Sequence, residues 1–399
     1  MNNTNTTNNF NILELANNIV SNSIEKYANN SYVMYRLHNY INNLPTQLEN
    51  DLKTYEQRIE RNDELTNELE LFSKVFLTNN KYYYLPTNNT FYNYDGKTFS
   101  IIKEDDILHN LLSTISNEGK LIQWKYKTKA TLIKQIKERH LFNTVPETYT
   151  IEKVTNFLQE TLFNSKQEAK YFLTIIGDGL LRKQTNNMYF VSSNVKEFIN
   201  YVNELIFAIT RSYSYQSNFV SRYHNVHDIT NYRLIPEKYN YLLLQDFNKA
   251  LDNIFIDLLC VSTYYSSSYQ SAENFIQTEA KDSLRDYTLF FTNKTVNNIV
   301  EDFVSNCFTK IDNNTTDTNI NITNNTNTNN TISWQSMLRI WNKYLDELNI
   351  PNFIRYDNLK DILKTLLTVS SSNLETEDIS FINITSKYMS TKQTNKSNK

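Results

Sequence analysis

Residues 81–115 read KYYYLPTNNTFYNYDGKTFSIIKEDDILHNLLSTI, and this stretch decides the fold class. Three short aromatic and β-branched runs, Lys81–Leu85, Thr90–Tyr94 and Phe99–Ile102, are separated by an Asn-rich turn and an Asp-Gly turn, as hairpins require. From Glu104 onward the apolar residues recur at helical spacing, and three acids occupy the end where the helix dipole is positive. The sequence therefore predicts a three-stranded β meander followed by a helix, within a mainly α chain of the α+β class.

Helical segments are predicted on both sides of the meander, because apolar residues recur there at intervals of three and four. They cover 10–27, 47–77, 127–140, 150–162, 165–181, 194–209, 239–261, 280–308 and 334–367. A short strand is expected at 188–192. The order of helices and strand across 120–215 is compatible with a winged-helix-like module, and equally with another small α+β domain.

Three polar tracts indicate where the ordered parts end. Residues 1–9 and 383–399 are expected to be disordered tails, and the Asn/Thr-rich tract at 312–331 is expected to be a flexible linker. The predicted domains are a helical region at 10–78, an α+β domain at 79–230, a helical domain at 231–311 and a C-terminal helical piece at 332–382.

Composition excludes several classes of protein. The 399 residues include 4 Gly and 5 Pro, too few for a glycine-rich phosphate loop or a collagen-like chain. The net charge of −3 creates no global field that would attract nucleic acid, so any basic surface must be local. Two cysteines are too few for a disulfide framework and are typical of an intracellular protein. No stretch approaches the roughly 18 consecutive apolar residues of a membrane span, and no cofactor is predicted.

The strongest local departure from neutrality lies between Lys120 and Arg139. Seven basic residues share this segment with one acid, Glu138, and two aromatic residues are interleaved with them. Basic side chains neutralise phosphates, and aromatic rings stack on unpaired bases. With two basic residues from a later helix end, the predicted nucleic-acid-binding residues are Lys120, Trp124, Lys125, Tyr126, Lys127, Lys129, Lys134, Lys137, Arg139, Arg182 and Lys183. The alternative is a solvated helix face with the two aromatic residues in the core.

Two other groups of residues are weaker candidates for a metal or catalytic site. The acids at 104–106 could contribute to a magnesium site only with a partner carboxylate from elsewhere, and capping with complementation of the helix dipole explains them without a metal. His224 and His227 have a spacing that metal ligands use on a helix, and Asp228 with Cys260 could complete the set, but no paired metal-binding motif is present. The sequence therefore assigns no metal site and no catalytic residue, and an enzyme of unrecognised type stays an alternative.

The segment 47–77 suggests a second kind of function. It is long, charged and free of Gly and Pro. Its apolar stripe has a period near that of a coiled coil or a bundle helix and consists of Leu48, Leu52, Tyr55, Ile59, Leu65, Leu69, Phe72 and Phe76. The stripe slips between Ile59 and Leu65, which favours a helix packed on its own domain. The alternative is a structural protein that forms a homo-oligomer through this helix.

Four segments resemble stretches of uncharacterised proteins from giant nucleocytoplasmic DNA viruses of the mimivirus kind. They are EDDILHNLLSTIS at 104–116, PETYTIEKV at 146–154, AKYFLTIIGDGLLRK at 169–183 and ISWQSMLRIWNKYLDELNIPNF at 332–353. The resemblance spans residues 80–385 and carries no assigned catalytic residues. A looser similarity relates 83–108 to the region before the ATPase of viral primase–helicases, although this chain has no Walker A motif.

This resemblance implies a viral accessory protein that binds DNA or RNA in replication or transcription and has no ATPase of its own. The expected partners are nucleic acid, other viral replication or transcription proteins, or further copies of the chain, without a membrane. The expected location is the host cytoplasm, in a viral factory, or the virion.

Overall fold

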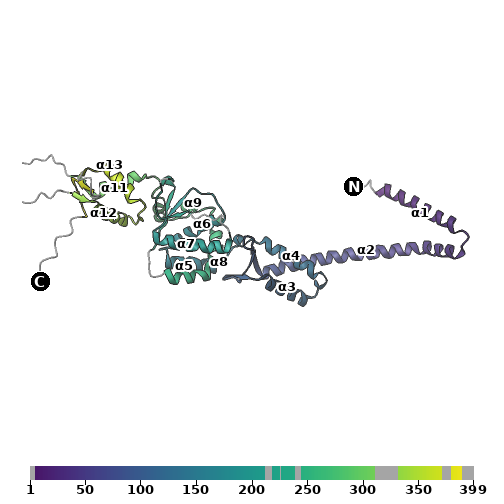
Figure 1. Cartoon of the computed structure of the whole chain (residues 1–399). Helices are drawn as coiled ribbons and strands as arrows, with labels where there is room; N and C mark the ends of the chain where they lie inside the picture. The colour runs from purple at the N-terminus through teal and green to yellow at the C-terminus, as the bar shows by residue number, and fades with distance from the viewer. Residues whose placement is uncertain are drawn as a thin grey trace, which may run out of the picture. The chain divides into compact units, whose positions relative to one another are not determined.

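The computed structural model describes residues 5–211, 218–224, 226–238, 244–310, 331–370 and 379–388 (Figure 1). This part of the chain contains thirteen α-helices and small sheets of two or three strands. The predicted class, mainly α with a small β meander, is therefore confirmed. The chain divides into two compact units, of which unit 1 comprises Met1–Asn79 with Leu108–Leu132, and unit 2 comprises Asn80–Ile107 with Ile133–Lys399.

Unit 1 contains two successive helices, α1 (Asn5–Tyr27) and α2 (Ser31–Asn79). Between them, the side-chain oxygen of Asn30 accepts a hydrogen bond from Val33 N at 3.2 Å and so caps α2. Both helices are longer than predicted, and α1 begins inside the predicted N-terminal tail, which is wrong for those residues. The helix prediction started only after Pro45, yet α2 runs through this proline, which removes a single main-chain donor.

The two halves of α2 present different apolar faces. Near the C-terminal end, the buried apolar side chains are Leu69, Phe72 and Phe76. The upstream stripe stays 43–62% exposed and consists of Leu48, Leu52, Tyr55 and Ile59. At about 100° per residue, the irregular step from Ile59 to Leu65 turns the apolar face by roughly 100° around the helix. The predicted packing of this helix on its own domain therefore holds only for its C-terminal end.

Two further helices complete unit 1 and continue into unit 2. They are α3 (Glu104–Glu118), which belongs to unit 1 from Leu108 onward, and α4 (Lys125–Glu138), which belongs to it up to Leu132. A 3-10 turn at Ile122–Trp124 connects them. The predicted helix after the meander is confirmed, with its three acids in the first turn.

Unit 2 begins with the meander, whose strands β1 (Lys81–Leu85), β2 (Thr90–Tyr94) and β3 (Phe99–Ile102) have the predicted bounds. The strands are antiparallel, with β2 in the centre. In the second turn, Asp95 Oδ1 accepts two main-chain hydrogen bonds at 2.7 Å. Gly96 has a φ of 94°, which an L side chain rarely adopts. Local turn chemistry thus accounts for this sheet.

The main core of unit 2 is helical. Its long helices lie close to the predicted segments and are α5 (Thr148–Thr161), α6 (Lys166–Leu180), α7 (Ser193–Thr210) and α8 (Leu244–Tyr269). Helices α6 and α8 approach each other closely at Gly177, where an added Cβ atom would lie 2.0 Å from the main-chain oxygen of Ser262. This contact requires glycine.

A small parallel sheet replaces the predicted winged-helix alternative. Strand β4 (Met188–Phe190) pairs in parallel with β5 (Phe219–Val220) on one side and with β6 (Tyr232–Leu234) on the other. Helix α7 crosses from β4 to β5 and forms a βαβ unit. A winged helix carries an antiparallel hairpin, and the described residues between 188 and 234 contain none. The winged-helix alternative is therefore wrong.

A second core in unit 2 joins segments on both sides of the predicted linker. Phe303 in α11 (Val296–Cys307) packs edge-on against Trp341 in α12 (Trp334–Glu347), with ring centroids 5.0 Å apart. Helix α13 (Tyr356–Leu366) contributes to the same cluster. The predicted boundary therefore falls inside one core rather than between two domains, while 311–330 lie outside the described residues.

Short strands complete this second core. Strand β11 (Ile384–Ser386) pairs antiparallel with β7 (Phe308–Lys310), so the predicted C-terminal tail is wrong for β11. A second sheet has β10 (Ser380–Ile382) between β8 (Thr331–Ser333) and β9 (Val369–Ser370). The remaining helices are α9 (Ala272–Thr278) and α10 (Asp282–Thr288), so the predicted helix at 280–308 is interrupted between α10 and α11.

Candidate nucleic-acid interface

The buried side of α4 determines where its basic residues lie. Thr128, Leu132 and Ile136 recur once per turn, and each is fully buried. Tyr126, Lys127, Lys134 and Lys137 are exposed on the other sides of the helix, whereas Lys125 and Lys129 are half-buried. The two units divide after Leu132, so the basic residues belong to two separate groups, one in unit 1 and one in unit 2.

The unit 1 group centres on Tyr126, whose side chain is 85% exposed. Trp124 is half-buried, and Lys127 Nζ lies 3.6 Å from the centroid of its ring. Among the described residues, no acid forms an ion pair with Lys125, Lys127 or Lys129. The alternative that places both aromatic residues in the core is therefore wrong for Tyr126, which is the aromatic ring available for stacking.

Lys120, in contrast, is already paired. Its ammonium group lies 2.7 Å from Glu68 Oε1, and this contact raises the pKa of Lys120. Nearby, Arg61 donates a hydrogen bond to Gln123 Oε1 at 2.5 Å. Glu68 of α2 thus neutralises the start of the basic segment, and the lysines without an ion pair to a described acid begin at Lys125.

The unit 2 group lies beside the meander. Lys137 Nζ is 5.7 Å from the ring centroids of both Tyr84 and Phe91. The main-chain oxygen of Arg139 accepts a hydrogen bond from Tyr84 N at 2.8 Å. Lys134 lies 4.0 Å from Glu138 across one turn of α4. These residues have local partners and contribute less free positive charge than the unit 1 group.

Arg182 and Lys183 do not form a comparable patch. Lys183 Nζ donates hydrogen bonds to the main-chain oxygens of Ser266, at 2.7 Å, and Gln270, at 2.5 Å, and lies 3.4 Å from Asp178 Oδ1. Its charge is therefore used inside unit 2 to hold the end of α8. Arg182 is exposed, with a left-handed φ of 55° just after α6.

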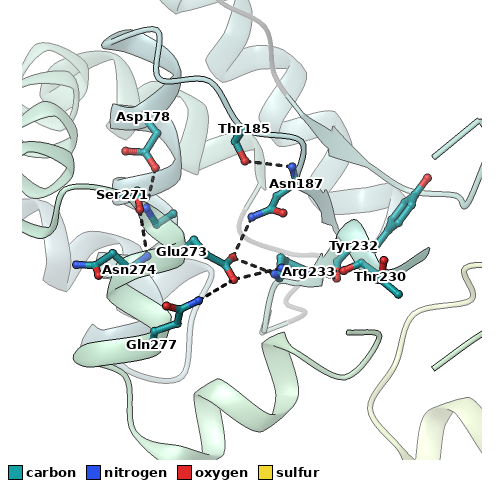
Figure 2. Close-up of polar contacts among 11 residues, drawn as sticks. Asp178, Thr185, Asn187, Thr230, Tyr232, Arg233, Ser271, Glu273, Asn274 and Gln277 are labelled. Atoms are coloured by element: carbon teal, nitrogen blue, oxygen red, sulfur yellow. Dashed lines mark hydrogen bonds and ion pairs between the residues drawn. The ribbon is translucent and has the colours of Figure 1, made fainter. Parts of the chain in front are cut away.

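A polar network that the sequence did not reveal surrounds Arg233 and Glu273 (Figure 2). Arg233 in β6 forms a bidentate contact with Glu273 in α9, with nitrogen–oxygen distances of 3.0 and 3.2 Å. Arg233 also donates to the main-chain oxygen of Thr230 at 2.7 Å. Asn187 donates to the same carboxylate of Glu273 at 2.9 Å. The contacts connect β6, α9 and the segment before β4.

The acid at the end of α6 is held in the same way. Asp178, which is labelled in Figure 2, accepts hydrogen bonds from Ser266 Oγ at 2.6 Å and from Ala272 N at 2.7 Å. Nearby, the hydroxyl of Tyr171 is buried without a hydrogen-bond partner, and burial raises the pKa of Tyr171 well above its usual value. The charged groups of this network satisfy one another, which indicates a structural role.

The residues considered for metal binding do not assemble. Among the described residues, no three His, Cys, Asp or Glu side chains are grouped as metal ligands would be. Asp228 caps a 3-10 turn by accepting from Thr230 N at 3.0 Å, which lowers the pKa of Asp228. Cys260 is fully buried in the main core, and burial raises the pKa of its thiol. The acids at 104–106 occupy the first turn of α3, as dipole complementation requires.

An open groove of about 670 Å³ lies in unit 2 beside Glu237. Glu237 Oε1 accepts a hydrogen bond from Ser192 N at 3.0 Å, while its Oε2 is buried without a partner. Burial raises the pKa of Glu237. Glu168 and Asp346 also line the groove. Ser192, Ser283 and Tyr287 line the groove with these acids.

Replacing Glu237 with glutamine is expected to stabilise the fold at neutral pH. Because the pKa of Glu237 is raised, the folded chain binds the carboxyl proton more tightly than the unfolded chain does. The protonated carboxyl therefore contributes its full stability at pH values below the ordinary glutamate pKa. This contribution is lost as the pH rises through the pKa of Glu237 in the folded chain. We expect Tm at pH 7 to rise by about 2 °C, and the gain to vanish near pH 4. The exposed control Glu160→Gln should leave Tm unchanged. A lower Tm for Glu237→Gln at pH 7 would show that the bond from Ser192 outweighs the cost of burial.

Comparisons of the chain with models of protein families, with curated proteins and with solved structures found no match. Among the described residues, no helix combines the length and the apolar character needed to cross a membrane. The candidate interface is therefore argued from its own geometry.

Proposed function

We propose that the chain binds nucleic acid through the residues at the start of α4, Lys125–Lys129. The observation that supports this most is the exposure of Tyr126, a large aromatic side chain that is 85% accessible. It lies between two lysines that form no ion pair with any described acid. Single exposed apolar residues are common on protein surfaces. An exposed ring flanked by unpaired cations is a combination suited to an unpaired base and its phosphates.

The lysines and Tyr126 contact different parts of the nucleic acid. Lys125, Lys127 and Lys129 neutralise phosphates and release counterions, which makes binding depend on salt but not on sequence. Tyr126 stacks on a base, whereas the face of the Trp124 ring is already covered by the ammonium group of Lys127. This arrangement favours single-stranded DNA or RNA over a duplex, because only unpaired bases expose their faces to a side chain.

The biological setting of this proposal rests on the resemblance to giant-virus proteins alone. In that setting the chain is an accessory protein of viral replication or transcription, working in the viral factory or carried in the virion. It contributes binding rather than ATP hydrolysis, since its sequence has no phosphate loop.

Charge reversal at Lys125, Lys127 and Lys129 is expected to abolish binding. Fluorescence anisotropy with labelled oligothymidylate, oligouridylate and duplex DNA would measure affinity across a salt series. Three neutralised phosphates predict a slope of about −2 for log affinity against log salt on a single strand. Tyr126→Ala is expected to weaken single-strand binding about tenfold while leaving this slope unchanged, because stacking does not release counterions.

A matched control carries the same charge change elsewhere. Lys103, Lys166 and Lys281 are exposed lysines of unit 2, and their triple replacement by glutamate should leave most of the affinity intact. If the wild-type chain binds none of the three probes at low salt, the proposal fails. It also fails if both triple variants lose affinity equally, since the effect would then come from net charge alone.

A further inference from the structure

The exposed apolar stripe on the first half of α2 is longer than the segment singled out in the sequence. It starts at Met34 and ends at Ile59, and its members are Met34, Leu37, Ile41, Leu44, Leu48, Leu52, Tyr55 and Ile59. Six of the eight side chains, from Ile41 to Ile59, are 43–62% exposed. An apolar stripe of this length is far larger than the scattered apolar residues of an ordinary surface.

The stripe is narrow and straight. Its members are separated by three or four residues throughout, and at about 100° per residue all eight fall within an arc of roughly 80°. A helix that covers a globular core usually has a wider apolar face, whereas a narrow seam is typical of helix pairing in coiled coils. The spacing therefore fits the side of one long partner helix.

Contacts within unit 1 lie on the opposite side of α2. Arg61 and Glu68 bind the segment at 120–123, and at about 100° per residue they point roughly 140° and 160° away from the middle of the stripe. The buried residues Leu69 and Phe72 follow the turn of the apolar face after Ile59. The slip in the pattern thus separates a part of α2 that packs on its own unit from a part that stays uncovered.

We propose that this seam is an interface with a second copy of the chain, whose α2 packs alongside in parallel. A seam with the same spacing on both partners is self-complementary, so two copies bury each other's stripe along its whole length. The chain's own α1 is too short to cover the stripe along its whole length. All of α1 is about 35 Å long, whereas Ile59 lies about 42 Å along α2 from Ser31.

The charges beside the seam favour the parallel direction. One flank carries Glu49, Glu56 and Glu60, and the other flank carries Asp51 and Arg58. In an antiparallel pair each flank meets the same flank of its partner, so the glutamates would face one another. In a parallel pair the glutamate flank meets the flank that carries both Asp51 and Arg58, whose formal charges cancel. Repulsion therefore disfavours the antiparallel arrangement.

Sedimentation equilibrium of the full chain tests the association directly. We expect twice the 47.2 kDa chain mass at micromolar concentration. Leu52→Asp with Ile59→Asp should reduce this to the single-chain mass, because both changes place charge in the seam. The control Thr54→Asp with Gln57→Asp adds the same charge on the outer side of the helix and should leave the dimer intact. A wild-type monomer, or dissociation of both double variants, would overturn the proposal.

Cysteine crosslinking tests the direction of the pair. The native Cys260 and Cys307 are buried, so they leave a low background. In a parallel pair each seam residue faces its own counterpart, and Leu48→Cys and Tyr55→Cys should each form a disulfide-linked dimer under mild oxidation. Gln57→Cys, on the outer side, should not. Crosslinking at Leu48→Cys, which lies near the middle of the stripe, but not at Tyr55→Cys would indicate an antiparallel pair. Equal crosslinking at Gln57→Cys would contradict a defined seam.

Discussion

Gly177→Ala is expected to lower the free energy of unfolding by about 3 kcal/mol or more. The added Cβ atom would lie 2.0 Å from the main-chain oxygen of Ser262 and 2.7 Å from Ser266 Cβ. Neither atom belongs to the free end of a flexible side chain, so α6 and α8 must move apart in the centre of the main core. The gain in helix propensity from glycine to alanine is only about 1 kcal/mol and cannot compensate.

Denaturant unfolding followed by circular dichroism would measure this loss. Lys166→Ala is a suitable control, since it lies exposed in the first turn of the same helix and should change stability by less than about 0.5 kcal/mol. Equal stability of the two variants would show that α6 and α8 do not approach as closely as the structure indicates. A soluble but less stable Gly177→Ala protein is the expected result.

The elements that sequence predicted well are those with local causes. The meander was predicted to the residue because its strands, its Asp95-Gly96 turn and the acids that follow it are all neighbours in the chain. Hydrophobic periodicity likewise located the long helices. The ends of the helices are predicted less well. Pro45, for example, indicates a helix that starts after it, but α2 continues through this residue.

The elements that sequence missed depend on distant partners. Strands β5 and β6 have only two or three residues each, and they pair in parallel with β4 across intervening helices and loops. Strand β11 lies in a polar segment and exists through its pairing with β7, some distance back along the chain. Segments this short carry no periodic pattern, so only the tertiary fold specifies them.

The candidate interface shows the same limit at the level of single residues. Composition correctly located a basic segment, but it could not distinguish paired lysines from unpaired ones. Lys120 is neutralised by Glu68 and Lys183 is used at the end of α8, both through contacts between distant parts of the sequence. The exposure of Tyr126 follows from the burial of Thr128 and Leu132 on the other side of α4. The proposal therefore narrows from eleven residues to the group around Tyr126.

Glu273→Leu is expected to destabilise unit 2 by about 3 kcal/mol, the lower end of the cost of breaking a buried ion pair. The side chain of Arg233 is only 9% exposed, so its guanidinium group would stay buried without a counter-charge. The double variant Arg233→Met with Glu273→Leu removes both charges and should be more stable than Glu273→Leu alone. Denaturant unfolding of the wild type, both single variants and the double variant would give the coupling energy.

The exposed pair of Arg285 and Asp282 provides the control, because Asp282 is 90% exposed and Asp282→Ala should cost less than about 0.5 kcal/mol. If the two changes at Arg233 and Glu273 are simply additive, the pair does not act as a unit. A large coupling energy with a stable double variant would have a more specific meaning. The ion pair would then contribute little net stability, and its main effect would be to fix β6 against α9, since a buried charge tolerates only the arrangement in which its partner is present.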